Sequence, residues 1–279
     1  MKVGMIGTDS THAIAFSERL QKKGYKLFAY RGGSTSELSI NRIERVSAEL
    51  SRRGIPFITT LQEMADICDA FIITSVDASQ HLEQFAVLAA SEKPIFIDKP
   101  LAQNYEQASS IIELANEKGI PLMSCSALRF AEEIQHAKSK KSIEAVDIIT
   151  PLPMLQEFDY YYYGIHAVEM ISALKGTSVK DIAVTFNDQQ HFITLTFQDG
   201  TVSSIRGYLQ HRQSFQFVTH TRQQSEWFEI AEGDVRFYDR LIDAMEQFFI
   251  EKKSPINQTD TLQIIKLLDQ IKYIASTTY

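Results

Sequence analysis

Short apolar runs alternate with amphipathic stretches through the first half of the chain. Runs of strand length recur at Val3–Ile6, Lys26–Tyr30, Ala70–Thr74, Ile95–Ile97 and Pro121–Ser124. The stretches between them carry apolar residues at helical spacing, most clearly at Ala108, Ile111, Ile112 and Ala115. Strands that alternate with helices in this way are typical of a doubly wound parallel sheet. We therefore predict an α/β domain of the Rossmann type over residues 1–125.

The pattern changes after about residue 140. Ile193, Leu195 and Phe197 alternate with polar residues, and Asp199-Gly200 then forms a turn into a further apolar run, which indicates a β-hairpin. Helical spacing of apolar residues follows around 167–174, around 241–249 and over 264–275. We predict a second domain of α+β type over residues 126–279 with a largely antiparallel sheet, whose last helix could pack back on the first domain.

Composition and charge narrow the class of protein. The 279 residues suffice for two domains, and no apolar run approaches the roughly 20 residues that a membrane span needs. The amino end, Met1 to Gly7, carries no signal-peptide stretch, so we expect a cytoplasmic protein that does not bind membranes. A net charge of -7 argues against nucleic-acid binding, which needs clustered Lys and Arg. Cys68 and Cys125 fit buried thiols better than a disulfide framework.

The first predicted strand runs into the segment Gly7-Thr8-Asp9-Ser10-Thr11-His12, directly before a helix. A dinucleotide-binding fold has Gly-x-Gly-x-x-Gly at this place, where bare backbone approaches the pyrophosphate at the helix amino end. Only the first glycine is present here, because Asp9 replaces the second and His12 the third. A carboxylate would repel a pyrophosphate, whereas Ser10, Thr11 and the helix amides suit an anion. Alternatively, Asp9, Ser10 or Thr11 is simply the helix N-cap.

The end of the second predicted strand bears on the choice between NAD and NADP. It reads Ala29-Tyr30-Arg31-Gly32-Gly33 and lacks the acid that would bind the adenosine ribose of NAD. Arg31 could accept the 2'-phosphate of NADP, which favours NADP over NAD. The alternative is an arginine that only faces solvent.

The segment Asp98-Lys99-Pro100 follows another apolar strand. Pro100 biases Lys99 toward an extended backbone, so Lys99 should stand at the carboxyl end of that strand, where open parallel sheets bind ligands. Beside Asp98 it is either a surface ion-pair partner or a functional cation with a tuned pKa.

An ordered set of motifs resembles the Gfo/Idh/MocA oxidoreductases. The set comprises Ile73-Thr74-Ser75 followed by His81, then Lys93 to Pro100, then Ala127-Leu128-Arg129, and finally Gly164-Ile165-His166 to Glu169. Asp98-Lys99-Pro100 is similar to the Glu-Lys-Pro of that family, with Asp in place of Glu. The resemblance covers nearly the whole chain.

The resemblance implies roles for particular residues. Lys99 and His166 correspond to the catalytic lysine and the acid/base histidine, and histidine is the side chain that titrates nearest neutral pH. His166 could instead be satisfied by a neighbouring carbonyl. The implied cofactor-binding residues are Gly7, Thr8, Asp9, Ser10, Thr11, His12, Arg31, Thr74, Ser75, His81, Asp98 and Lys99.

Further residues of the resemblance are candidates for substrate binding. Arg129, Tyr162 and Tyr163 join His166 in this group, although Arg129 and His81 could equally form structural contacts, and tyrosines are as often packing residues. Members of the family often carry an acid where Tyr162 stands, and Asp159 or Glu169 could substitute for it. The histidines at 136, 191, 211 and 220 show no ligand spacing, so we predict no metal.

The sequence therefore favours an NAD(P)-dependent oxidoreductase acting on a secondary alcohol of a sugar, polyol or related hydroxy compound. The resemblance also implies a homo-oligomer formed through the sheet of the second domain. The competing hypothesis is a non-redox relative, a ligand sensor or accessory subunit, because Asp9, the missing ribose acid and Tyr162 all depart from the family pattern.

Overall fold

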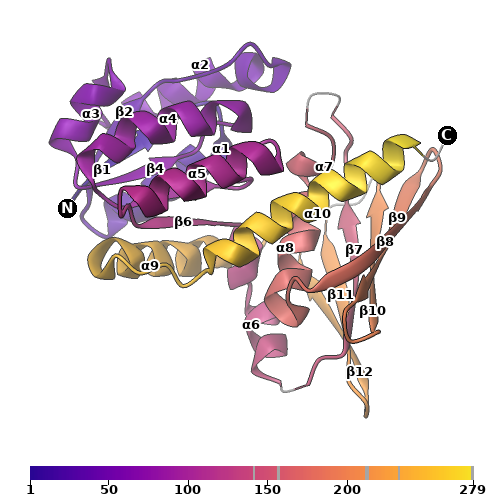
Figure 1. Ribbon diagram of the computed structural model, residues 1–279. Coiled ribbons are helices and arrows are strands. Elements are labelled where there is room, and N and C mark those ends of the chain that lie inside the picture. Colours follow the sequence, from indigo (N-terminus) through magenta and orange to yellow (C-terminus); the bar gives the residue numbers. More distant parts are fainter. Residues whose placement is uncertain (141, 156–157, 211–213, 232, 278–279) are drawn as a thin grey trace. The chain divides into compact units, whose positions relative to one another are not determined.

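The computed structural model describes residues 1–140, 142–155, 158–210, 214–231 and 233–277 (Figure 1). The chain divides into two compact units. The first unit comprises Met1–Cys125 and Tyr238–Thr261, and the second comprises Ser126–Phe237 and Leu262–Tyr279. The chain thus returns to the first unit over residues 238–261, which the sequence assigned to the second domain.

The first unit is a doubly wound α/β fold, which confirms the predicted class. Its parallel sheet has the order β3-β2-β1-β4-β5-β6, so the strand order reverses between β1 and β4. The strands are β1 (Lys2–Ile6), β2 (Lys26–Tyr30), β3 (Phe57–Ile58), β4 (Ala70–Ile73), β5 (Ile95–Asp98) and β6 (Leu122–Cys125). Ligands of such folds bind at the carboxyl ends of the strands beside this reversal.

Helices cover both faces of this sheet (Figure 1). One face carries α3 (Leu61–Ile67), α4 (His81–Leu88) and α5 (Tyr105–Glu117), and the other carries α1 (Thr11–Lys22), α2 (Glu37–Arg52) and α9 (Arg236–Glu251). Short 3-10 turns, Ala78–Gln80 and Ala89–Ser91, flank α4. The buried strands read as continuous apolar runs because both faces are covered.

Polar contacts explain why α9 belongs to the first unit. Arg19 Nε donates to Asp239 Oδ1 at 2.6 Å, and Lys23 Nζ lies 2.7 Å from Glu246 Oε2. The apolar side of α9 is buried as well, with Met245 and Phe248 fully inside. The helical periodicity predicted α9 but carried no information about the unit on which it packs.

The second unit contains a six-stranded mixed sheet in the order β12-β11-β7-β10-β9-β8. All neighbouring strands are antiparallel except β7 and β10, which are parallel. The strands are β7 (Ala145–Pro151), β8 (Val179–Phe186), β9 (Gln190–Phe197), β10 (Val202–Tyr208), β11 (Phe215–His220) and β12 (Ser225–Ile230). The α+β class with a largely antiparallel sheet is therefore confirmed.

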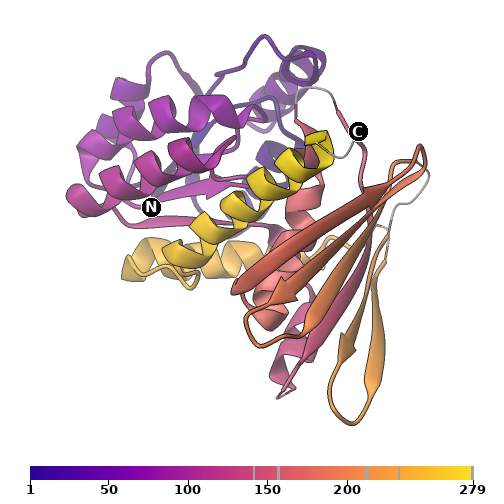
Figure 2. The same ribbon diagram turned by 45° about the vertical axis from the view of Figure 1, so that its right-hand side comes forward.

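One face of this second sheet is covered by helices (Figure 2). The helix α8 (Gly164–Lys175) contacts β7 and β10, and α6 (Glu132–Ser139) contacts β12. The remaining helices are a 3-10 turn at Ala127–Phe130, α7 (Asp159–Tyr162) and α10 (Gln258–Thr277), whose first four residues count with the first unit. Ile193, Leu195 and Phe197 are buried under the helices, and the residues between them are half-buried.

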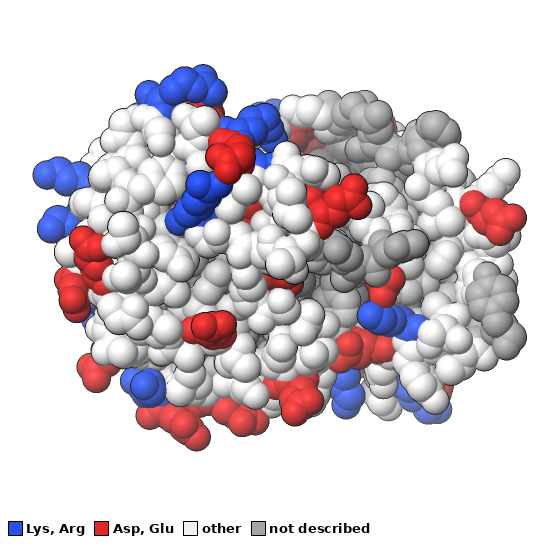
Figure 3. All heavy atoms as spheres, turned by 90° about the horizontal axis from the view of Figure 1, so that it is seen from above, with Lys and Arg blue, Asp and Glu red and all other residues white. Residues whose placement is uncertain are grey.

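The surface carries charges of both signs. On the face drawn in Figure 3, basic side chains stand among acidic ones and do not form a continuous band over the described residues. None of the described helices is long and apolar enough to cross a membrane.

Candidate functional site

The glycine loop begins at Gly7, where the backbone makes a tight turn against the end of β4. Gly7 has a φ of +88°, and a Cβ at this position would lie 2.4 Å from the backbone nitrogen of Ser75. Thr74 Oγ1 donates to the carbonyl of Gly7 at 2.7 Å. Only glycine fits here, so the first position of the motif is required by backbone contact between the β1 and β4 ends.

The next residues of the loop are used to start α1 and to anchor β2. Ser10 is the N-cap of α1, and its hydroxyl accepts from the backbone N–H of His12 at 3.2 Å. Thr8 is buried, and its hydroxyl lies 3.1 Å from the Arg31 carbonyl. Thr11 is exposed as the first residue of the helix. The N-cap interpretation thus holds for Ser10.

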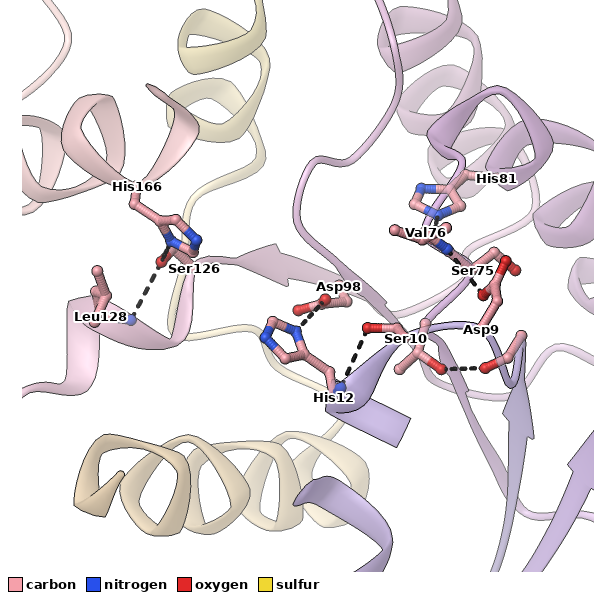
Figure 4. A network of polar contacts seen from close by, with 12 residues as sticks. Asp9, Ser10, His12, Ser75, Val76, His81, Asp98, Ser126, Leu128 and His166 are labelled. Carbon is pink, nitrogen blue, oxygen red and sulfur yellow. Dashed lines mark hydrogen bonds and ion pairs between the residues drawn. The ribbon is translucent and has the colours of Figure 1, made fainter. Parts of the chain in front are cut away.

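Asp9 turns into the protein (Figure 4). Its carboxylate accepts from Ser39 Oγ at 2.7 Å and from the backbone N–H of Val76 at 3.1 Å. Burial raises the pKa of Asp9, and the hydrogen bonds from Ser39 and Val76 partly offset this rise. The carboxylate of Asp9, which replaces the second glycine, therefore connects the glycine loop to α2 and to the segment after β4.

Replacing Asp9 with glycine should test this position of the carboxylate. Asp9→Gly restores the second glycine of the motif but removes two buried hydrogen bonds, so we expect the free energy of unfolding to fall by about 1–3 kcal/mol. Cofactor affinity should not improve, because the lost charge faces the interior. Urea unfolding and cofactor titration measure the two effects, with Asp9→Asn as the control that keeps a polar side chain. Much tighter cofactor binding by Asp9→Gly would contradict the inward orientation.

His12, at the third glycine position, forms an ion pair with Asp98 at the end of β5 (Figure 4). The distance from His12 Nδ1 to Asp98 Oδ2 is 2.6 Å, although 86 residues separate the two in sequence. The ring of His12 packs against Phe16 and Tyr238, each with its centroid 5.4 Å away. The sequence named both residues as candidates but gave no sign that they pair.

Lys99 directly follows β5 and is partly buried. Burial lowers the pKa of its amino group, Asp98 opposes this shift, and Arg42 of α2 adds to it. Burial also raises the pKa of Asp98, but His12 and Lys99 together hold that pKa below its ordinary value. Asp98 is therefore ionised at neutral pH, and burial makes the amino group of Lys99 easier to deprotonate.

His81 connects the segment after β4 to the segment after β5 by hydrogen bonds. It is buried, and its ring nitrogens lie 3.1 Å from the Leu101 carbonyl and 2.9 Å from the Ser75 carbonyl. Both hydrogen bonds form together only when both nitrogens carry a proton. Ser75 is held in addition by Gln84, whose Nε2 donates to Ser75 Oγ at 2.9 Å. His81 and Ser75 thus hold the segments that follow β4 and β5 in place at the carboxyl edge of the first sheet.

Arg31 lies at the exposed end of β2 and forms an ion pair with Glu44 of α2. Gly32 and Gly33 follow with positive φ values of 58° and 106°. The loop then enters α2 through Ser36, whose hydroxyl caps the helix by accepting from the Ser39 N–H. This segment presents backbone and hydroxyl groups but no acid at the place where an adenosine ribose binds in dinucleotide folds.

In the second unit, His166 lies in the first turn of α8, and its Nδ1 is 2.6 Å from Ser126 Oγ. Ser126 also accepts from the Leu128 N–H at 3.2 Å (Figure 4). Tyr163 and Phe215 flank the His166 ring, with centroids 5.7 Å and 5.6 Å away. A hydroxyl therefore holds the histidine. Sequence reasoning missed Ser126, because only the fold brings it to His166.

Four tyrosines stand in a row at 160–163, and two of them are partly exposed while they pack on other aromatic rings. Tyr162 and Tyr163 are half-buried and meet edge to face at 5.1 Å, and Tyr163 stacks on Phe215 at 6.3 Å. The acids considered as replacements for the family carboxylate have other partners. Asp159 pairs with Lys272 at 2.8 Å, and Glu169 pairs with Arg129.

Arg129 is a buried structural residue of the second unit. Its Nε donates to Glu169, its Nη2 donates to Ser172 Oγ at 2.8 Å, and its carbonyl accepts from Gln135 at 2.6 Å. These contacts tie the 3-10 turn at Ala127–Phe130 to α8. Arg129 therefore makes structural contacts within the second unit, which was the alternative to substrate binding.

Breaking this ion pair should destabilise the protein strongly. Glu169→Gln leaves a buried guanidinium without its counter-charge, so we expect the free energy of unfolding to fall by about 3–5 kcal/mol in urea. The exposed pair Arg222–Glu144 is the matched control, and Glu144→Gln should cost at most about 1 kcal/mol. Equal losses in both variants would contradict the structural role of Arg129.

The edge of the first unit fits a bound dinucleotide. The Asp9 carboxylate is turned inward, where it accepts hydrogen bonds from Ser39 and Val76. Among the described residues, Asp98 Oδ1 and Gln80 Oε1 are buried without a hydrogen-bond partner. Gln80 also donates to the Gly33 carbonyl at 2.7 Å, so its open acceptor stands beside the loop after β2. Ribose hydroxyls are donors that satisfy such acceptors.

Metal ligands are not gathered in the described part of the chain, where no three His, Cys, Asp or Glu side chains form a group that could hold an ion. Position 211, one of the histidines considered above, lies outside the described residues.

The fold is a Rossmann-type α/β unit with an added α+β unit, and comparisons with known proteins agree. Residues 1–127 match the family model described as "Oxidoreductase family, NAD-binding Rossmann fold". Residues 1–127 are thus similar to the Gfo/Idh/MocA oxidoreductases. A protein of Salmonella typhimurium with the name "Putative oxidoreductase YceM" is 33% identical over 86 residues, which are 31% of this chain and 28% of that protein.

Solved structures share the fold over the full chain. The myo-inositol dehydrogenase of Lactobacillus casei, in complex with NAD(H) and myo-inositol, superposes with a TM-score of 0.80 at 16% identity, covering 100% of this chain and 95% of that chain. The WlbA dehydrogenase of Bordetella pertussis, in complex with NADH and UDP-GlcNAcA, gives 0.79 at 14% identity, covering 100% and 97%. At such identities the likeness establishes the fold alone.

Proposed function

We propose that the protein is an NAD(P)-dependent dehydrogenase that oxidises a secondary alcohol of a sugar, polyol or related hydroxy compound, or reduces the corresponding carbonyl. The observation that carries this proposal is Lys99, an ammonium whose burial lowers its pKa, at the carboxyl end of β5 beside the glycine loop. The two dehydrogenases named above were solved with myo-inositol and with a UDP-sugar, which supports a polyhydroxylated substrate.

The residues proposed to hold the dinucleotide come from the ends of β1, β2, β4 and β5. Backbone amides at the start of α1 and the Ser10–Thr11 segment suit the pyrophosphate. Asp98 Oδ1 and Gln80 Oε1 are open acceptors for ribose hydroxyls. Bound there, a nicotinamide ring accepts or supplies the hydride.

Lys99 and His166 are proposed to have different roles toward the substrate hydroxyl: Lys99 stabilises charge and His166 accepts a proton. As the carbon loses its hydride, the hydroxyl must release its proton, and the Lys99 ammonium stabilises the negative charge that develops on oxygen. His166 is proposed to take that proton, while Ser126 holds its Nδ1. Ser126 thereby fixes the ring in place of the carboxylate that family members often carry, and it is proposed as a positioning residue.

Two of the three departures that motivated a non-redox hypothesis have structural explanations. Asp9 bonds inward to Ser39 and Val76, so its charge is directed away from a pyrophosphate. Tyr162 stands where family members often carry an acid, but His166 still has a hydrogen-bond partner, because Ser126 bonds its Nδ1. Nothing specific therefore favours a sensor or accessory subunit over a dehydrogenase.

The cofactor is proposed to be NADP in preference to NAD, because Arg31 and the serine-rich start of α2 suit a phosphate. Arg31→Ala should raise the dissociation constant of NADP by about tenfold or more and leave that of NAD nearly unchanged. Glu44→Gln, which frees Arg31 from its ion pair, should act in the opposite direction. Quenching of protein fluorescence measures both constants. Unchanged NADP affinity in Arg31→Ala would show that Arg31 only faces solvent and does not bind the 2'-phosphate.

The open face of the second sheet is proposed to join subunits into a homo-oligomer in the cytoplasm. One row across this face consists, in register, of Glu229, Gln216, Ile149, Arg206 and Phe192. Trp227 of β12 is 57% exposed on the neighbouring row. Such a mixture of aromatic, aliphatic and hydrogen-bonding groups suits a wet protein interface.

Thermal stabilisation tests the proposed function at its first step. A ligand that binds the folded state alone raises the unfolding temperature, so NADP or NAD should shift it in a concentration-dependent way. A panel of polyols, sugars and nucleotide sugars, assayed for formation of reduced cofactor, then identifies the substrate. Absence of any shift at millimolar nucleotide would overturn the proposal.

A further inference from the structure

We propose that the hydrogen bond from Tyr161 of α7 to Asp269 of α10 positions His166, the proposed proton acceptor. Asp269 acts through Tyr161 and is therefore a positioning residue, not a catalytic one. Its effect on catalysis rests on the proposed function, whereas its effect on the His166 ring concerns the folded protein alone. All three residues belong to the second unit.

Two consecutive tyrosines of α7 are buried in the second unit and bond to different elements. Tyr161 is 5% exposed, and its hydroxyl donates to Asp269 Oδ1 at 2.5 Å. Tyr160 is 2% exposed, and its hydroxyl lies 2.5 Å from Nδ1 of His191 in β9. A buried phenol hydroxyl usually has a hydrogen-bond partner, and a carboxylate is a strong acceptor. The short helix α7 is therefore attached to α10 through one tyrosine and to the sheet through the other.

An ion pair joins the same two helices. Lys272 Nζ lies 2.8 Å from Asp159 Oδ2, and Lys272 is three residues from Asp269, on the same side of α10. Asp159 has a φ of +44°, a conformation that aspartate adopts more readily than most residues. The side chains of Lys272 and Asp159 are 54% and 28% exposed, so solvent weakens this ion pair. We therefore assign the main positioning contact to the buried bond between Tyr161 and Asp269.

The first turn of α8 follows α7 directly and packs against it. A Cβ at Gly164 would lie 3.3 Å from Tyr160 Cβ, so the first residue of α8 is in close contact with the buried tyrosine. The backbone N–H of His166 donates to the Tyr163 carbonyl at 3.0 Å. The ring of Tyr163 also meets the His166 ring edge to face, with 5.7 Å between the centroids. A displacement of α7 therefore moves both the turn that carries His166 and a ring that flanks it.

The position of α7 thus bears on the bond between His166 and Ser126. That bond, at 2.6 Å, requires the imidazole to stand at the Ser126 hydroxyl. When Tyr161 loses its partner on α10, the segment before α8 is held less firmly, and the imidazole occupies the bonded position for less of the time. Misplacing a reacting group by about 1 Å can lower a rate by 10²-fold. A contact on α10 can therefore affect proton transfer without touching the substrate.

Nuclear magnetic resonance of the histidine ring nitrogens measures this positioning without cofactor or substrate. The histidines are labelled with ¹⁵N, and the signals of His166 are assigned by their absence in His166→Asn. Tyr161→Phe removes only the hydroxyl, and Asp269→Ala removes the acceptor, so both should shift or broaden the Nδ1 signal of His166. Asp269→Asn keeps an oxygen acceptor and should leave that signal close to that of the natural protein. His136 on α6 is the internal reference in each spectrum.

Steady-state kinetics measure the same contact through turnover. Tyr161→Phe and Asp269→Ala should each lower kcat by about 10–100-fold. The double variant should lose no more than either single variant, because both changes break one bond. Asp269→Asn should retain most of the kcat. Cofactor affinity should stay unchanged in all of these variants, because the residues proposed to hold the dinucleotide belong to the first unit.

Tyr25→Phe is the matched control. Tyr25 stands just before β2 and also donates its hydroxyl to a carboxylate, Glu246 Oε1, at 2.8 Å. Its replacement removes a hydrogen bond of the same kind within the first unit and leaves α7 intact. The His166 signals and kcat should therefore match those of the natural protein.

Two results would overturn the inference. One is an unchanged His166 spectrum in both Tyr161→Phe and Asp269→Ala, and the other is an equal change in Tyr25→Phe. If Asp269→Ala does not give a native circular dichroism spectrum, Tyr161→Phe and Asp269→Asn test the same bond. Altered His166 signals without turnover by the natural protein would refute only the dehydrogenase proposal. Turnover with unaltered signals would refute only the positioning role.

Discussion

Replacing Lys99 with methionine is expected to reduce the kcat of alcohol oxidation by about 10³-fold, while cofactor affinity changes little. Methionine retains the length and apolar stem of lysine but cannot stabilise negative charge on the substrate oxygen. Steady-state kinetics of reduced-cofactor formation measure the loss. Because burial lowers the pKa of Lys99, its charged form opposes folding at neutral pH. Lys99→Met should therefore be at least as stable as the natural protein in urea.

Lys93→Met is the matched control for this variant. Lys93 stands shortly before β5 and donates to the Ala65 carbonyl at 2.7 Å, so its loss should affect stability slightly and kcat hardly at all. A Lys99→Met protein that keeps its kcat to within a fewfold would show that Lys99 is a structural ion-pair partner. The combination of lost activity and retained stability is what distinguishes a functional cation from a structural one.

Replacing His166 with asparagine is expected to lower kcat by about 10²–10⁴-fold and to flatten the pH dependence of kcat. Asparagine still reaches Ser126 by a hydrogen bond but cannot take up the proton that the alcohol releases. Ser126→Ala should have a smaller effect in the same direction, because the imidazole remains and loses only the bond to Nδ1. The pH profile of kcat, measured for both variants, separates loss of the base from loss of its orientation.

His136→Asn serves as the control for the histidine variants. His136 lies on α6 with its ring centroid 6.0 Å from that of Phe228, and nothing in the proposed chemistry uses it. An unaltered pH profile in His166→Asn would refute the role of His166 in proton transfer. A full loss of activity in Ser126→Ala would instead indicate that the hydroxyl itself carries the proton.

The sequence predicted those parts of the fold that local patterns determine. Apolar runs identified β1, β2, β4, β5 and β6, and β3 escaped because it is only Phe57–Ile58. Gly7 and Lys99 were predictable because backbone chemistry places them: a tight turn requires the glycine, and Pro100 keeps Lys99 next to the end of β5 at Asp98.

Contacts between distant segments could not be predicted in this way. The sequence left open whether Asp9 faces a ligand or caps the helix, because the direction of its side chain depends on Ser39, which lies 30 residues away. The bond between Ser126 and His166 spans 40 residues, and the pair His12–Asp98 spans 86. A single sequence contains no signal for such partners, since they are set by how helices and strands pack.

The most direct test of the central claim is transfer of a labelled hydride. The polyol or sugar that turns over best in the panel is prepared with deuterium on its secondary carbons and incubated with oxidised cofactor and either the natural protein or Lys99→Met. The account predicts deuterium in the reduced nicotinamide formed by the natural protein and a rate lower by about 10³-fold in the variant. Reduced cofactor without deuterium, or equal rates for the two proteins, would contradict it.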